Sequence, residues 1–162
     1  MKNLILTISL ALFSTVAFSQ NSVSELIQKF KGNDDVNIVT ISGSLLRMGS
    51  SFVDADDAES KAAKSIIDQV DEMIIVSTNT ISKGREIRRF AEKQVDRGNY
   101  EEMMMIDSDG EEITFFGKVK NKKIIELFII VGEKDDEIVL ISMSGKIDPN
   151  SVVQLLQKTG VN

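Results

Sequence analysis

Cysteine, histidine and tryptophan are absent from the 162 residues, and proline occurs once, at position 149. Without cysteine the chain has no disulfide, no thiolate for metal binding or nucleophilic attack, and no point of lipid attachment behind a leader. Without histidine it lacks the commonest general base near neutral pH and the commonest ligand for zinc or copper. We therefore expect no cofactor, no metal site, and no complete catalytic set for most hydrolase mechanisms.

Acidic residues outnumber basic ones by 25 to 19, which gives a formal charge of −6 at neutral pH. This balance argues against nucleic acid or an anionic membrane as the main partner. Hydrophobic residues make up 42% of the chain, and no low-complexity tract interrupts them. The composition therefore favours a packed fold over a disordered chain.

The first nineteen residues have the pattern of a secretory leader. Lys2 supplies the positive end, residues 4–13 supply an apolar centre too short for a permanent anchor, and Ala17-Phe18-Ser19 offers a small-x-small cleavage site. Cleavage there would leave 143 of the 162 residues and change the charge from −6 to −7, because Lys2 is the only charged residue lost. We predict a signal peptide over residues 1–19, one domain over residues 20–162, and a protein exported to the periplasm or medium. The alternative is an uncleaved N-terminal anchor.

Apolar periodicity and capping residues predict four helices. They are residues 22–30, with Ser22 and Glu25 at capping-box spacing; a helix from an Asp54 cap to about Val70; residues 82–97; and residues 149–158 behind an Asp148 cap. Their inward faces are expected to include Ile87, Phe90, Ala91 and Val95 in the third helix.

Six strands are predicted, over residues 36–46, 72–78, 102–108, 112–119, 124–132 and 137–144. The first is interrupted at Gly43 and followed by a loop over residues 47–53. The order strand, helix, strand predicts a right-handed parallel crossover, and the last four strands, joined by short polar turns such as Asp109-Gly110, predict an antiparallel meander. We expect an α+β fold with a mixed sheet of about six strands packed by three to four helices.

The strands over residues 124–131 and 138–143 are apolar on both faces, so both faces of the sheet need cover. Crossover helices can cover one face. The other must be met by a terminal helix or by a second protein.

The leader and three segments of the chain carry a family resemblance. The segments are Ile41-Ser42-Gly43-Ser44-Leu45-Leu46, Ile113-Thr114-Phe115-Phe116-Gly117 and Ile141-Ser142-Met143-Ser144-Gly145-Lys146-Ile147. In these features the chain resembles the bacterial family known as domain of unknown function 4252. The resemblance implies a secreted or envelope-associated α+β domain. It implies no reaction, cofactor or catalytic residue. Many members look like lipoproteins, and this chain departs from them because no cysteine follows the leader.

Arg85, Arg89, Lys93 and Arg97 recur every four residues along the third predicted helix and form a basic ribbon on an acidic protein. Arginine side chains suit carboxylate or phosphate groups, so the ribbon predicts binding of an anionic ligand or an acidic partner surface. The alternative is a solvated helix face, on which Glu86, Glu92 and Asp96 pair in part with the cations.

Two acidic clusters and a methionine run are more readily explained by structure than by metal binding. The clusters are Asp54, Asp56, Asp57, Glu59 and Asp107, Asp109, Glu111, Glu112, and neither has the glycine spacing of a calcium loop, so we expect a capped helix start and a hairpin turn. Strand alternation puts Met104 on the face opposite Met103 and Met105, which favours core packing over a shared soft-metal site.

These features together predict an exported, non-catalytic binding or interaction module of the bacterial envelope. The partner would be an envelope or secreted protein, held by the basic helix or by an uncovered sheet face, with no nucleic acid and no membrane anchor after cleavage. One alternative is a secreted hydrolase that uses carboxylates or a serine-lysine pair, although no nucleophile-elbow motif is present. Another is a structural stress or assembly factor without a small ligand.

Overall fold

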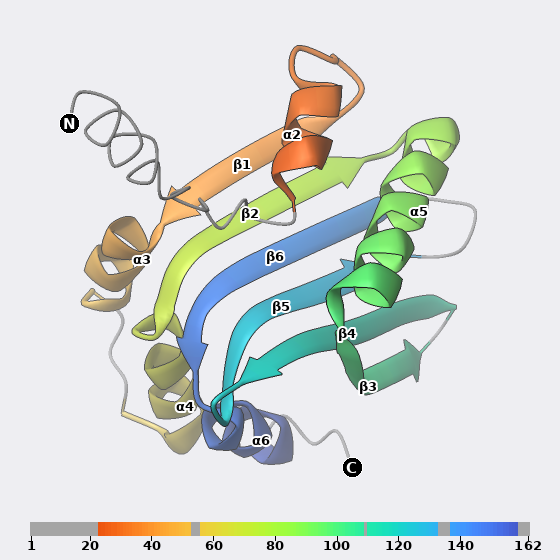
Figure 1. Ribbon diagram of the computed structural model, residues 1–162. Coiled ribbons are helices and arrows are strands. Elements are labelled where there is room, and N and C mark those ends of the chain that lie inside the picture. Colours follow the sequence, from red (N-terminus) through yellow and green to blue (C-terminus); the bar gives the residue numbers. More distant parts are fainter. Residues whose placement is uncertain (1–22, 53–55, 109, 133–136, 159–162) are drawn as a thin grey trace, which may run out of the picture.

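The computed structural model describes residues 23–52, 56–108, 110–132 and 137–158 (Figure 1), so the predicted leader lies outside it. The described residues form one six-stranded sheet, in which every neighbouring pair is antiparallel, and five helices. The strands are β1 (Asn37–Ser42), β2 (Val70–Thr78), β3 (Glu101–Ser108), β4 (Glu111–Lys120), β5 (Lys123–Val131) and β6 (Ile138–Ile147). The helices are α2 (Ser24–Phe30), α3 (Gly43–Ser50), α4 (Ala58–Ile67), α5 (Ile81–Gly98) and α6 (Pro149–Lys158). The α+β class and the six strands are confirmed.

The predicted parallel crossover at the start of the sheet is wrong, because β1 and β2 are antiparallel neighbours. Two helices connect them where one helix and a loop were predicted. The extra helix, α3, begins at Ser42, whose Oγ accepts a hydrogen bond from the Leu45 amide at 3.3 Å. Because α3 and α4 return the chain to the end of the sheet where β1 finished, β2 starts there, and Ser42 pairs with Glu72 (Figure 1).

The antiparallel meander predicted for the last four strands is confirmed, because β3, β4, β5 and β6 pair in chain order. The last strand, β6, lies between β5 and β2, so the sheet order is β1-β2-β6-β5-β4-β3. Gly110, with φ 89°, accepts the left-handed backbone of the predicted hairpin turn, whereas Asp109 lies outside the described residues.

The first face of the sheet is covered by α5 and α2. The longer helix, α5, carries the chain across this face from the end of β2 to the start of β3 (Figure 1). Its predicted inward residues are confirmed: Ile87 and Ala91 are fully buried, and Phe90 and Val95 pack against the same core. Leu26 and Phe30 of α2, together with its N-cap residue Val23, belong to the same core as Val76, Phe128 and Leu140 of the sheet.

Within the described ranges, the second face is covered at one end, by α3, α4 and α6. One residue from each helix, Leu46, Ile66 and Val152, packs against a smaller core of Val70, Ile124, Leu127 and Ile147. The last two helices also contact each other, with Ser65 Oγ 3.1 Å from Ser151 Oγ. The rest of the second face has no cover from the described residues.

Helix caps agree with the sequence in one case and differ in another. Asp148 caps α6 as predicted, since its Oδ1 accepts a hydrogen bond from the Asn150 amide at 2.9 Å. For α4 the cap is Asp57, whose Oδ1 accepts from the Ser60 amide at 2.8 Å. The predicted cap, Asp54, lies outside the described residues.

Candidate functional site

The basic ribbon lies on the outward side of α5. Arg85, Arg89, Lys93 and Arg97 are all exposed, while the buried residues of the helix, Gly84, Ile87 and Ala91, face the sheet. The helix periodicity therefore puts the cations on the side opposite to the core. This exposure agrees both with a binding ribbon and with a solvated helix face, so the role of the ribbon in binding stays a prediction.

A shallow groove of about 290 Å³ runs beside the ribbon, where α5 meets α2. It is lined by Lys29, Glu86, Arg89, Phe90 and Lys93. The groove therefore adds Lys29, from α2, and the ring of Phe90 to the ribbon residues Arg89 and Lys93. The four-residue spacing of the ribbon indicates neither of these two neighbours.

The one carboxylate that lines the groove is already paired with two lysines. Lys29 Nζ lies 2.8 Å from Glu86 Oε2, and Lys83 Nζ lies 3.2 Å from Glu86 Oε1. These hydrogen bonds, the one from Lys29 first, hold the pKa of Glu86 below its ordinary value. Both ammonium groups also lie over the Phe30 ring, 5.4 and 5.7 Å from its centroid. Glu86 is therefore neutralised by its neighbours, and Arg89 and Lys93 give the groove its positive potential.

Arg88, one of the cations that flank the ribbon, has a structural position. Its Nη2 donates to the Gly132 carbonyl at 2.9 Å, and its Nη1 lies 3.7 Å from Glu112 Oε1. These contacts connect α5 to the start of β4 and to the residue that follows β5. Arg88 therefore has contacts with the sheet, whereas the four ribbon residues are exposed, and sequence spacing alone does not separate the two groups.

One described residue of each acidic cluster has a structural contact. Asp57 caps α4, and Glu112 is paired with Arg88. Within the described ranges, no three acidic side chains converge in a way that could hold a metal ion. Asp109 and the side chain of Glu59 lie outside the description.

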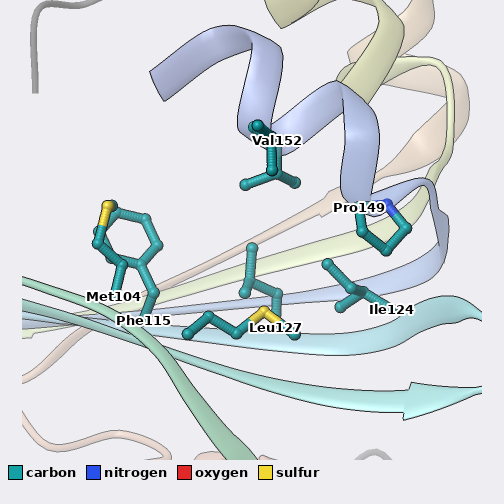
Figure 2. Close-up of a pocket in the computed structure, with 8 residues that line it drawn as sticks. Met104, Phe115, Ile124, Leu127, Pro149 and Val152 are labelled. Carbon is teal, nitrogen blue, oxygen red and sulfur yellow. The ribbon is translucent and has the colours of Figure 1, made fainter. Parts of the chain in front are cut away.

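The prediction that Met104 faces away from both neighbouring methionines is wrong, because a β-bulge lies between Glu102 and Met104. Met103 and Met104 line one pocket of about 110 Å³, and Met105 is exposed. Figure 2 shows this pocket between α6, which contributes Pro149 and Val152, and the sheet, which contributes Met104, Phe115, Ile124 and Leu127. In the sequence, this position of Met103 is indicated by Gly117, a glycine within a strand. A Cβ at Gly117 would lie 2.1 Å from Met103 Cε, so a larger residue there would clash with the methionine.

A serine-lysine pair is present on the second face, between Ser50 of α3 and Lys64 of α4. Lys64 Nζ donates to Ser50 Oγ at 3.1 Å and lies 3.7 Å from Asp68 Oδ1. The Ser50 hydroxyl, in a residue only 6% exposed, donates its own proton to the Arg47 carbonyl at 2.9 Å. The hydroxyl proton of Ser50 is thus held by the Arg47 carbonyl, and the hydrogen bond from Lys64 joins α3 to α4.

The fold and these surfaces define a compact α+β sheet domain with a basic helical side and an apolar pocket. The match to the family model described as Domain of unknown function (DUF4252), over residues 30–155, shows that the chain belongs to this family. No curated protein and no solved structure matches the chain. Among the described helices, none combines the length and the apolar character needed to cross a membrane.

Proposed function

We propose that the protein is an exported, non-catalytic binding module of the bacterial envelope that holds an acidic partner against the outer side of α5. The observation that carries the proposal is the exposure of Arg85, Arg89, Lys93 and Arg97 on a protein whose formal charge is −6. An acidic protein repels anionic partners on most of its surface, so a local row of cations directs them to one side.

The groove beside the ribbon supports the same function. Arg89 and Lys93 line it together with the ring of Phe90, which suits a partner segment that presents carboxylates next to an apolar side chain. Because Glu86 is paired with Lys29 and Lys83, it does not oppose an incoming carboxylate at full strength.

The test uses a fluorescein-labelled peptide of ten glutamates and the mature chain, with fluorescence anisotropy as the readout. The double variant Arg89→Glu, Lys93→Glu is compared with Lys61→Glu, Lys120→Glu, which makes the same change in net charge at exposed residues outside α5. We expect the α5 variant to lose at least about tenfold in affinity at low salt and the control to lose about twofold or less. Equal losses in the two variants would refute the proposal, because long-range charge alone would then explain binding.

A further inference from the structure

Beyond α3, α4 and α6, the second face of the sheet is an apolar strip two residue rows wide. Strand register places one residue from each strand in the first row, namely Val39, Ile75, Ile141, Ile129, Phe115 and Met104. The second row, from Asn37 on β1 to Ile106 on β3, contains four aliphatic residues and no charge. These two rows are called the strip below.

The strip is open to solvent although the opposite side of the same strands is closed. On β5, Phe128 and Ile130 are 0% and 4% exposed beneath the helices of the first face. Ile129 and Val131, which alternate with them and point to the strip, are only half-buried. On the edge strand, Val39 is 48% exposed. The strip carries no charge, its first row is apolar on all six strands, and its second row is apolar on four. Such a surface is larger than the scattered apolar residues of an ordinary surface and indicates a contact surface.

The dimensions of the strip match one α-helix. Six strands at about 4.8 Å spacing make the row about 24 Å long, and two rows about 7 Å apart make a strip roughly 14 Å wide. A helix about 10 Å across that spans 24 Å has about 16 residues. The first face gives an internal precedent, because α5, with 18 residues, crosses it from β2 to β3.

The far border of the strip is acidic. Asp35 precedes β1, Glu111 begins β4, and Glu137 precedes β6, and all three are exposed at the end of the sheet away from α6. Charge complementarity therefore favours lysine or arginine on the side of the ligand that faces this border.

The pocket at the near border supplies an anchor point. Met104 and Phe115 belong to the strip and also line the pocket beneath α6 (Figure 2). All eight residues that line it are apolar, so it suits a large apolar side chain of a bound helix, with the methionines as adaptable walls.

We propose that the strip binds a cationic amphipathic helix of about 16 residues from another protein. Its apolar stripe lies on the row from Val39 to Met104, one large side chain enters the pocket under α6, and its basic edge faces Asp35, Glu111 and Glu137. This site is separate from the α5 ribbon and selects the opposite charge.

The probe is a 16-residue synthetic helix of leucine and lysine with a single apolar stripe, compared with a scrambled peptide of the same composition. Met104→Lys places a charge in the strip, and Met105→Lys, at the next residue, places it on the other side of β3, where Met105 is 52% exposed. We expect Met104→Lys to weaken binding of the striped peptide at least about tenfold, Met105→Lys to change it less than about twofold, and the scrambled peptide to bind at least about tenfold more weakly.

Val39→Lys, on the edge strand, repeats the test if Met104→Lys does not fold, as judged by circular dichroism. Equal affinities of the Met104 and Met105 variants, or of the striped and scrambled peptides, would overturn the proposal. So would a wild-type dimer in sedimentation that Met104→Lys or Val39→Lys converts to a monomer, because a second copy of the chain would then occupy the strip.

Discussion

At the scale of single residues, the sequence correctly predicted the structural role of residues that act on their close neighbours in the chain. Asp148 and Pro149 start α6 as predicted, because a cap and an N-terminal proline act within one helical turn. Gly43 was interpreted as a break in a strand. Its actual constraint comes from residue 70, 27 positions away, where a Cβ on Gly43 would lie 2.2 Å from the Val70 carbonyl oxygen. No local pattern contains that contact.

The Gly43 contact leads to a stability prediction with a matched control. Gly43→Ala should lower the free energy of unfolding by about 3 kcal/mol, since the added methyl meets backbone atoms that cannot move aside easily. Gly49→Ala, in the same helix with nothing within 4 Å, should be neutral or stabilise by about 0.5 kcal/mol. Urea unfolding measures both changes. Similar losses in the two variants would show that the close approach to Val70 is not the cause.

Asp148 leads to a prediction about pH. Lys123 and then the Asn150 amide hold its pKa below the ordinary value by hydrogen bonding to the carboxylate. A depressed pKa contributes stability above the unfolded-state pKa of about 3.9, and this contribution is lost as the pH falls through the lower folded-state value. Asp148→Asn keeps a capping side chain but removes the charge. We expect the variant to melt below the wild type at pH 7 and to converge with it near pH 2. A constant difference in melting temperature over that range would contradict the assignment.

At the scale of elements, the strands and the long helix α5 followed from periodicity, and the connection between β1 and β2 did not. Residues 43–50 contain two glycines and two serines, which are poor helix formers. Tertiary contacts compensate, because Arg47 Nη1 donates to the Val70 carbonyl at 3.0 Å and Ser42 caps the helix. One additional helix in this connection changed the pairing of the strands from parallel to antiparallel.

The family match starts at residue 30, but α2, which precedes it, completes the first core. Leu26 is fully buried there. Leu26→Ala should therefore destabilise the protein by about 3 kcal/mol, whereas Leu45→Ala, at a residue 52% exposed, should change stability by less than about 0.5 kcal/mol. Chemical denaturation compares the two variants. A small effect at Leu26 would mean that α2 contributes little to the fold.

At the scale of the whole molecule, the sequence showed that β5 and β6 are apolar on both faces and therefore need cover on both. The structure shows how much of each face the helices cover. Among the residues that the structure describes, α2 and α5 close the first face, and the second is closed only near α6. Where α4 and α6 end on the sheet depends on their contact with each other, through Ser65 and Ser151, residues 86 positions apart. Periodicity can identify an apolar face but not how much of it remains open.

Export is a property of the whole chain and remains a prediction. The leader pattern predicts that protein recovered from the periplasm or medium begins at Gln20, and that a chain lacking residues 2–19 stays in the cytosol. N-terminal sequencing of the two fractions checks this. Recovery of the intact Met1 end from the membrane fraction would instead indicate an uncleaved anchor.

We propose the outer side of α5 as the contact surface for an acidic partner in the cell. The most direct measurement is site-specific photocrosslinking in the producing cells, with the photoreactive residue at position 89, 93 or 61 and identification of the adducts by mass spectrometry. We predict that positions 89 and 93 give one shared adduct with an acidic envelope component, and that position 61, also exposed but on α4, does not give it. The same adducts from all three positions, or none from the two on α5, would contradict the account.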